Sequence, residues 1–159
     1  MKDKVTSYTT LTMLIVKETR IERNLSQASM ADRCSKRPNA WAKIENGTTT
    51  FSLDSFFLSC NALATPPAVF MNAVDRYAVF LSQHGWSVLK QQLPEDEDKL
   101  LKEAKKYYAS EYHKNNSEGF RWDSNSVLNT PLQVFGGVQV SNVFKYAVDD
   151  DFRKTVDNQ

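Results

Sequence analysis

The sequence contains no apolar run that approaches the roughly 20 residues a membrane-spanning helix needs. No apolar segment follows the basic residues near Met1, so we expect no secretory signal and a cytoplasmic protein. Cysteine is also scarce. Cys34 and Cys60 both fall on apolar faces of helical patterns, which favours buried thiols in a reducing compartment over a disulfide or a metal site.

Residues that commonly carry catalysis are few and scattered. The two histidines, His84 and His113, are far apart in the sequence, and neither belongs to an arrangement of Cys, Asp or Glu at metal-ligand spacing. Gly136-Gly137 lacks the lysine and the following helix of a phosphate-binding loop. We therefore expect no enzyme, no cofactor and no metal, and we interpret each histidine as a partner for carbonyl groups at a helix C-terminus.

The charge of the chain is small in sum but uneven along its length. The net charge is +1, which argues against a protein that binds nucleic acid through bulk basicity. Residues 1–50 nevertheless hold nine Lys or Arg and five Asp or Glu, whereas the remainder holds eleven and fourteen. A basic N-terminal part beside a mildly acidic remainder is suited to local contact with phosphate groups.

Residues 25–47 have the pattern of two short helices joined by a tight turn. Ser26 is placed to cap the first helix through its hydroxyl, and Ser35 and Lys36 form the turn. Pro38 occupies a position where a helix can begin, because its missing N–H would be unpaired there anyway. The apolar residues at helical spacing are Met30, Ala31 and Cys34 in the first helix and Trp41 and Ile44 in the second. Gly47 ends the second helix, where a positive φ is expected.

This segment resembles the helix-turn-helix of the Cro/C1-type (XRE) family of phage and bacterial repressors. The matching features are Leu25-Ser26-Gln27, Met30-Ala31 and W-A-K-I-E-N-G over residues 41–47. Arg20 also falls at the family spacing from Glu45. The resemblance covers roughly residues 11–71. The chain departs from the family in Ser35, where a glycine is usual, in Lys36, where an apolar residue is usual, and in Pro38.

The resemblance implies that the second helix reads DNA bases in the major groove. With Trp41 and Ile44 turned inward, the expected base-reading residues are Arg37, Pro38, Asn39, Ala40 and Lys43. Arg37 is suited to guanine and Asn39 to adenine, while Pro38 offers apolar contact to a thymine methyl. The expected phosphate contacts are Gln27, Asn46, Thr48 and Thr49. Plain phosphate contact or solvation remains the alternative for Arg37 and Lys43, and local helix capping for Asn39.

Arg20 and Glu45 are expected to form a partly buried ion pair that ties the first helix of the chain to the reading helix. We interpret this pair as structural, because neither residue is needed for chemistry in a DNA-binding site. Removing one partner would leave the other charge buried and unpaired.

The fold predicted from the pattern is mainly α. An N-terminal five-helix, lambda-repressor-like domain is expected over residues 1–85, and a C-terminal module for dimerisation, effector or partner binding over residues 86–159. We expect residues 1–10 to form a loose arm and helices to cover about 11–23, 53–63 and 67–84. The core side of the fourth helix is expected to contain Leu53, Phe56, Phe57, Cys60 and Leu63. The fifth is expected to bury Val69, Phe70, Ala73, Val74, Tyr77, Phe80 and Leu81, with Gly85 as its cap.

The C-terminal module is expected to be helical with a small β-hairpin. Residues 95–98 place acids at the start of a helix that reaches about His113, and we expect them to be solvated. A three-residue loop at residues 135–137 would place Leu132, Val134, Val138 and Val140 on one face of a hairpin. The alternative for the last segment is a helix that Ser141 caps, with Phe144, Val148, Phe152 and Val156 at steps of four.

These observations predict a sequence-specific regulator of transcription that binds double-stranded DNA as a homodimer, most simply a repressor. Two other functions stay open. The chain could be an antitoxin whose C-terminal module holds a toxin, or a protein-interaction adaptor that keeps the fold without binding DNA.

Overall fold

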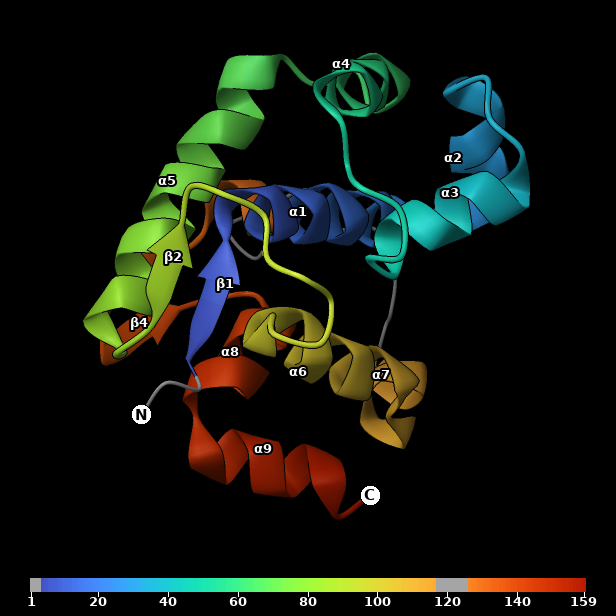
Figure 1. The fold of residues 1–159 in the computed structure, drawn as a ribbon. Coiled ribbons are helices and arrows are strands. Elements are labelled where there is room, and N and C mark those ends of the chain that lie inside the picture. Colours follow the sequence, from blue (N-terminus) through green and yellow to red (C-terminus); the bar gives the residue numbers. More distant parts are fainter. Residues whose placement is uncertain (1–3, 117–125) are drawn as a thin grey trace.

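The computed structural model describes residues 4–116 and 126–159 and is mainly helical, with two small sheets (Figure 1). Its α-helices are α1 (Tyr8–Glu22), α2 (Gln27–Arg33), α3 (Pro38–Glu45), α4 (Leu53–Ala62), α5 (Pro67–Gln83), α6 (Lys99–Ala109), α7 (Glu111–Asn116), α8 (Asn142–Val148) and α9 (Asp150–Asp157). A short 3-10 helix covers Val127–Asn129. The strands are β1 (Val5–Ser7), β2 (Ser87–Leu89), β3 (Leu132–Val134) and β4 (Gly137–Gln139).

Helix α1 lies at the centre of the molecule (Figure 1). Nearly all of its residues from Thr10 to Glu22 are buried, because α5 packs along one part of it and α3 contacts its other end. The buried apolar residues of the described chain form one cluster, which includes Leu14, Trp41, Tyr77 and Phe144. The elements on either side of α1 therefore share a common core.

Residues 4–10 belong to a strand and the start of a helix, so the expected loose arm is wrong for them, while residues 1–3 lie outside the described residues. Strand β1 pairs in parallel with β2, with Thr6 opposite Val88, and Ser7 caps α1. The hydroxyl groups of Thr6 and Thr10 donate to Asp98 at 2.9 and 2.6 Å. Asp98 is buried and also caps α6. The expectation that residues 95–98 are all solvated is therefore wrong for this carboxylate.

Helix α4 buries most of the core side that its apolar spacing predicts, because Phe56, Cys60 and Leu63 are buried. Leu53 and Phe57 are 66% and 48% exposed, so their placement in the core is wrong. Ser55 and Ser59 are buried in their place, with the Ser59 hydroxyl bonded to the Ser55 carbonyl. Small side chains face inward because α4 packs closely on α2, where Cys34 lies beside Ser59.

Helix α5 begins at Pro67 and ends next to Gly85, as the sequence predicts. Gly85 has φ +83, and the Trp86 amide donates to the Leu81 carbonyl at 3.0 Å. The apolar residues predicted for its core side are buried except Val69, which is exposed. His84 bonds the Phe80 carbonyl through Nδ1 at 2.8 Å, consistent with a histidine that satisfies a carbonyl at the helix end.

The predicted helix that reaches His113 is divided at Ser110. The Ser110 hydroxyl donates to the Tyr107 carbonyl and accepts from the His113 amide. This serine therefore ends α6 and begins α7, as serine side chains commonly do at helix boundaries.

Among the described residues, none of the helices combines the length and the apolar character that a membrane span requires.

Both structures considered for the last segment are present, one after the other. Strands β3 and β4 form an antiparallel hairpin, and α8 and α9 follow, separated at Asp149. Val134 pairs with Gly137, so the loop has two residues and not the expected three. The shift places Gln133 opposite Val138, so the expected single face of Leu132, Val134, Val138 and Val140 is wrong.

Polar contacts cross residue 85, where the sequence predicts a domain boundary. Glu22 of α1 accepts hydrogen bonds from the Ser126 hydroxyl and the Val127 amide at 2.8 and 2.6 Å. The Tyr77 hydroxyl accepts from the Ser141 amide at 2.9 Å. The boundary stays a prediction, and residues 117–125 of the predicted C-terminal module lie outside the described residues.

Candidate nucleic-acid interface

Helices α2 and α3 are joined by a tight turn at Cys34, Ser35 and Lys36. The Ser26 hydroxyl caps α2 by accepting from the Ser29 amide at 3.0 Å. Ser35 adopts φ +55, and the Lys36 amide donates to the Ala31 carbonyl at 2.8 Å. Ser35 thus takes the left-handed conformation that glycine adopts without steric cost. The small side chain of Ala31 is fully buried beneath this turn.

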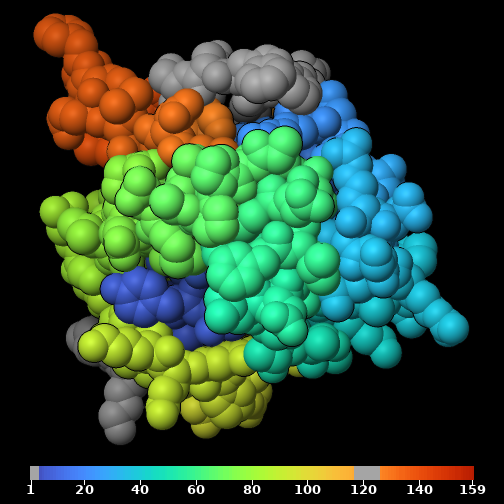
Figure 2. All heavy atoms as spheres, turned by 90° about the horizontal axis from the view of Figure 1, so that it is seen from above, coloured from blue at the N-terminus to red at the C-terminus, as the bar shows by residue number. Residues whose placement is uncertain are grey.

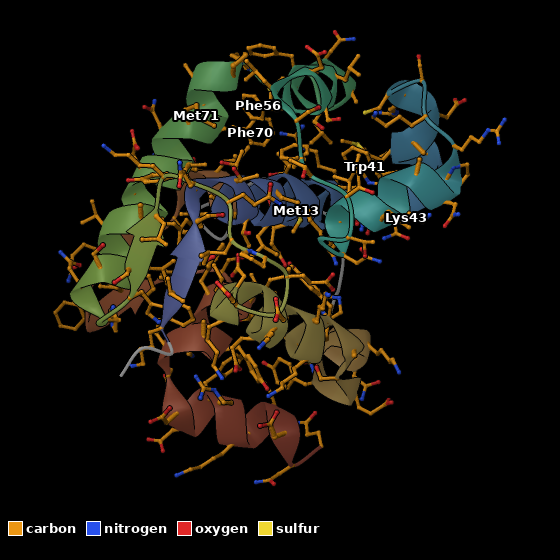
Figure 3. The ribbon with its side chains drawn as sticks, viewed as in Figure 1. Met13, Trp41, Lys43, Phe56, Phe70 and Met71 are labelled. Carbon is orange, nitrogen blue, oxygen red and sulfur yellow. The ribbon has the colours of Figure 1, made fainter. Side chains whose placement is uncertain are left out.

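Helix α3 has one buried edge and one exposed edge. Pro38 is its first residue, and Trp41 and Ile44 are 1% and 3% exposed. The residues predicted to read bases are all exposed: Arg37, Pro38, Asn39, Ala40 and Lys43. Trp41 and Lys43 lie on opposite sides of the helix (Figure 3). The exposed edge therefore carries two cations and one amide, with most of these groups in the first turn.

Glu45 connects three helices through its buried carboxylate. It accepts from Arg20 Nε at 2.6 Å and Nη2 at 2.8 Å, from Trp41 Nε1 at 2.7 Å, and from Gln27 Nε2 at 3.0 Å. Arg20 Nη1 also donates to the Leu25 carbonyl at 2.6 Å. The structure thus brings Arg20 and Glu45 together, and it adds Gln27 and Trp41 to the same network. Because both charges are buried, this network fixes how α3 leaves the core.

The residues predicted to contact phosphate lie at the edges of α3. Gln27 is exposed at the start of α2 but is held in place by Glu45. Asn46, Thr48 and Thr49 are exposed in the loop after α3. The Asn46 side-chain oxygen accepts from the Thr48 amide at 2.9 Å, and the Thr49 amide donates to the Lys43 carbonyl at 3.0 Å. This loop therefore folds back against the end of α3.

Leu101 of α6 lies against this loop at Gly47, a contact that the sequence pattern does not indicate. A Cβ atom on Gly47, which has φ +82, would lie 2.5 Å from Leu101 Cδ2. No local pattern links residues 47 and 101, because the contact depends on where the tertiary fold places α6 relative to this loop. The close approach explains why a residue without a side chain occupies position 47.

A second contact joins α1 to α6 below α3. The ammonium group of Lys17 lies 3.9 Å from the centre of the Tyr108 ring, and the Tyr108 hydroxyl donates to Glu18 at 2.7 Å. Burial lowers the pKa of Lys17. Burial and the neighbouring Glu18 raise the pKa of Tyr108 well above its usual value. Lys17 is thus a partly buried cation with a structural role.

The exposed cations of α3 differ from Lys17 in their surroundings. Within residues 4–116 and 126–159, no ion pair is recorded for Arg37 or Lys43. Both charges are therefore available to an anionic partner. Among the described residues, no group of three or more His, Cys, Asp or Glu is placed to hold a metal ion.

Comparison with models of protein families, with curated proteins and with solved structures finds no match to this chain. The function is therefore inferred from the residues and their geometry.

Proposed function

We propose that this chain is a sequence-specific regulator of transcription that binds double-stranded DNA in the cytoplasm. In this proposal α1–α5 form a five-helix, lambda-repressor-like domain, and α2 and α3 form its helix-turn-helix. The observation that carries the proposal is the exposed edge of α3, where Arg37, Asn39 and Lys43 lie opposite the buried Trp41 and Ile44. A helix of this kind fits the major groove of B-DNA.

The first turn of α3 supplies the groups best suited to bases. Arg37 can donate two hydrogen bonds to guanine O6 and N7, and the Asn39 amide matches the donor and acceptor of adenine. Pro38 and Ala40 offer apolar contact to a thymine methyl. Lys43 lies further along α3 and completes the reading edge.

Phosphate contacts on both sides of the groove would hold α3 in register. Gln27 lies at the start of α2, where unpaired amides and the helix dipole favour an anion. Asn46, Thr48 and Thr49 form the opposite contact. Such contacts position a protein on the duplex but carry no sequence information directly.

We further propose that the protein acts as a homodimer on an inverted-repeat operator and represses by covering a promoter. Paired recognition helices bind half-sites about 34 Å apart, or multiples of this distance. The C-terminal module would supply the dimer contact.

Selection of duplexes from a random pool with the full-length protein tests this proposal without knowledge of the operator. We expect enrichment of an inverted repeat, and a dissociation constant for it about a thousandfold or more below that for a scrambled duplex. The affinity for both duplexes should fall as salt increases. No enrichment at moderate salt would contradict the proposal and would favour an adaptor that does not bind DNA.

A further inference from the structure

The β3–β4 hairpin exposes several apolar side chains, although Val138 also borders a hollow that it shares with α5. Phe135, at the tip, is 108% exposed, and Val138 is 48% exposed. Leu132 and Val134 of β3 are also exposed. Figure 2 shows this part of the chain, in orange, standing out from the body of the molecule at the upper left. A two-stranded hairpin is marginally stable by itself, so a surface of this kind favours a partner.

The strands of this hairpin also have free edges. The sheet has only two strands, so each strand leaves one edge without a partner among the described residues. Proteins commonly protect such edges with lysine or other charges. Here residues 130–144 contain no charged side chain, although a quarter of the chain is charged. The hairpin therefore lacks the groups that normally prevent two strand edges from pairing.

We propose that a second copy of this chain covers the hairpin, so that two hairpins pack together across a twofold axis. The neutral strands favour this partner. The charged groups nearby, such as Asp75 and Arg76 of α5, are of both signs, so the strands themselves give a strongly charged partner no contact of one sign, whereas two copies bring together apolar side chains that carry no like charges. A second copy also presents the same strand in the same alternation, which a twofold interface requires.

The hairpin and α3 lie on opposite sides of the molecule (Figures 1 and 2). Packing through the hairpin therefore leaves the exposed edge of α3 uncovered. The hairpin interface would supply the contact for the homodimer of the proposed function. Dimerisation through the hairpin does not depend on DNA binding, so it is tested without DNA.

The experiment measures the mass of the full-length protein in solution by sedimentation and light scattering, over a wide range of concentrations. We expect the wild type to have twice the 18.2 kDa of one chain. Val134→Lys and Phe135→Lys place a charge at exposed positions, so the fold should persist by circular dichroism. Each should weaken dimerisation about tenfold or more, because the apolar interface would then have to bury two ammonium groups.

Leu53→Lys is the matched control, because Leu53 is an exposed apolar residue of α4, away from the hairpin. This variant should remain a dimer. A wild type that stays monomeric, a Val134→Lys protein that dimerises as strongly as the wild type, or a Leu53→Lys protein that becomes monomeric would each overturn the inference. A monomer that still binds its selected duplex would leave the role of α3 intact. A dimer that selects no duplex would contradict only the proposed function.

Discussion

Leu101 of α6 occupies the space that a side chain at Gly47 would need, since a Cβ atom there would lie 2.5 Å from Leu101 Cδ2. Gly85 has nearly the same φ, +83 against +82, but a Cβ atom on Gly85 would meet nothing within 4 Å. The two glycines thus share one backbone conformation and differ in their surroundings. Alanine substitutions at these two positions share the same backbone strain, and only the substitution at position 47 adds a steric contact.

Gly47→Ala should destabilise the protein more than Gly85→Ala. The left-handed conformation costs about 1–2 kcal/mol for alanine at either position, and the contact with Leu101 adds an overpacking cost of about 1–3 kcal/mol at position 47. Urea unfolding of both variants measures the difference. Equal losses would mean that Leu101 moves aside freely.

Leu101→Ala tests the same contact from the other side. In the Gly47→Ala background this substitution removes the obstructing methyl groups, so the double variant should lose less stability than the sum of the two single losses. The expected coupling is on the order of 1 kcal/mol, as found for residues in contact. Additive losses in the urea cycle would show that positions 47 and 101 are independent.

Arg20→Met should destabilise the protein by about 3–5 kcal/mol, because it leaves the Glu45 carboxylate buried without its charge partner. The exposed pair of Lys114 and Glu111 provides the control, and Lys114→Met should change stability by less than about 1 kcal/mol. Both are measured by urea unfolding. Similar small changes in the two variants would contradict the structural role of the buried pair.

Stability should fall as the pH rises above about 10, the usual tyrosine pKa. Burial raises the pKa of Tyr77 in the folded protein, so the unfolded chain releases this proton first and unfolding becomes more favourable. Lys17, whose pKa is lowered, acts in the opposite direction, but at pH values below about 10.4, the usual lysine pKa. The prediction therefore concerns the difference between the wild type and Tyr77→Phe in how the free energy of unfolding changes with pH. It does not concern the absolute slope for either protein.

The variant Tyr77→Phe should lose stability less steeply above pH 10, by up to about 1.4 kcal/mol per pH unit. At neutral pH it should be less stable by about 1–3 kcal/mol, because the buried Ser141 amide loses its acceptor. Urea unfolding at several pH values measures both effects. Parallel pH profiles for the two proteins would contradict the predicted alkaline contribution of Tyr77.

Local features of the fold could be predicted from the sequence. Ser26 and Pro38 begin helices where capping chemistry favours it, and Trp41 and Ile44 face inward as their spacing of three indicates. These predictions succeed because each depends only on neighbouring residues. The exposure of the α3 edge follows from the same pattern.

Features set by long-range contacts could not be predicted. Strand β1 is three residues long and pairs with a strand about eighty residues later, so its alternation is too short to recognise. Ser55 and Ser59 face inward on α4 beside the predicted Phe56 and Cys60, because α2 packs against this side of the helix, although their polarity predicts exposure. The contact of Leu101 with the loop after α3 could not be predicted either, because it joins residues that are far apart in the sequence. The hairpin loop differs from the expected one by a single residue, which is enough to exchange its faces.

The central claim is that the exposed edge of α3 reads DNA bases, and Asn39→Ala tests it most directly. The measurement is the ratio of dissociation constants for the selected duplex and a scrambled duplex, at one fixed salt concentration. Asn61→Ala, an exposed asparagine of α4, serves as the control and should leave the ratio unchanged. We expect Asn39→Ala to reduce the ratio by about fivefold to a hundredfold, the value of one good base contact, with little change in affinity for the scrambled duplex. An Asn39→Ala protein that discriminates between the two duplexes as well as the wild type does would contradict the account.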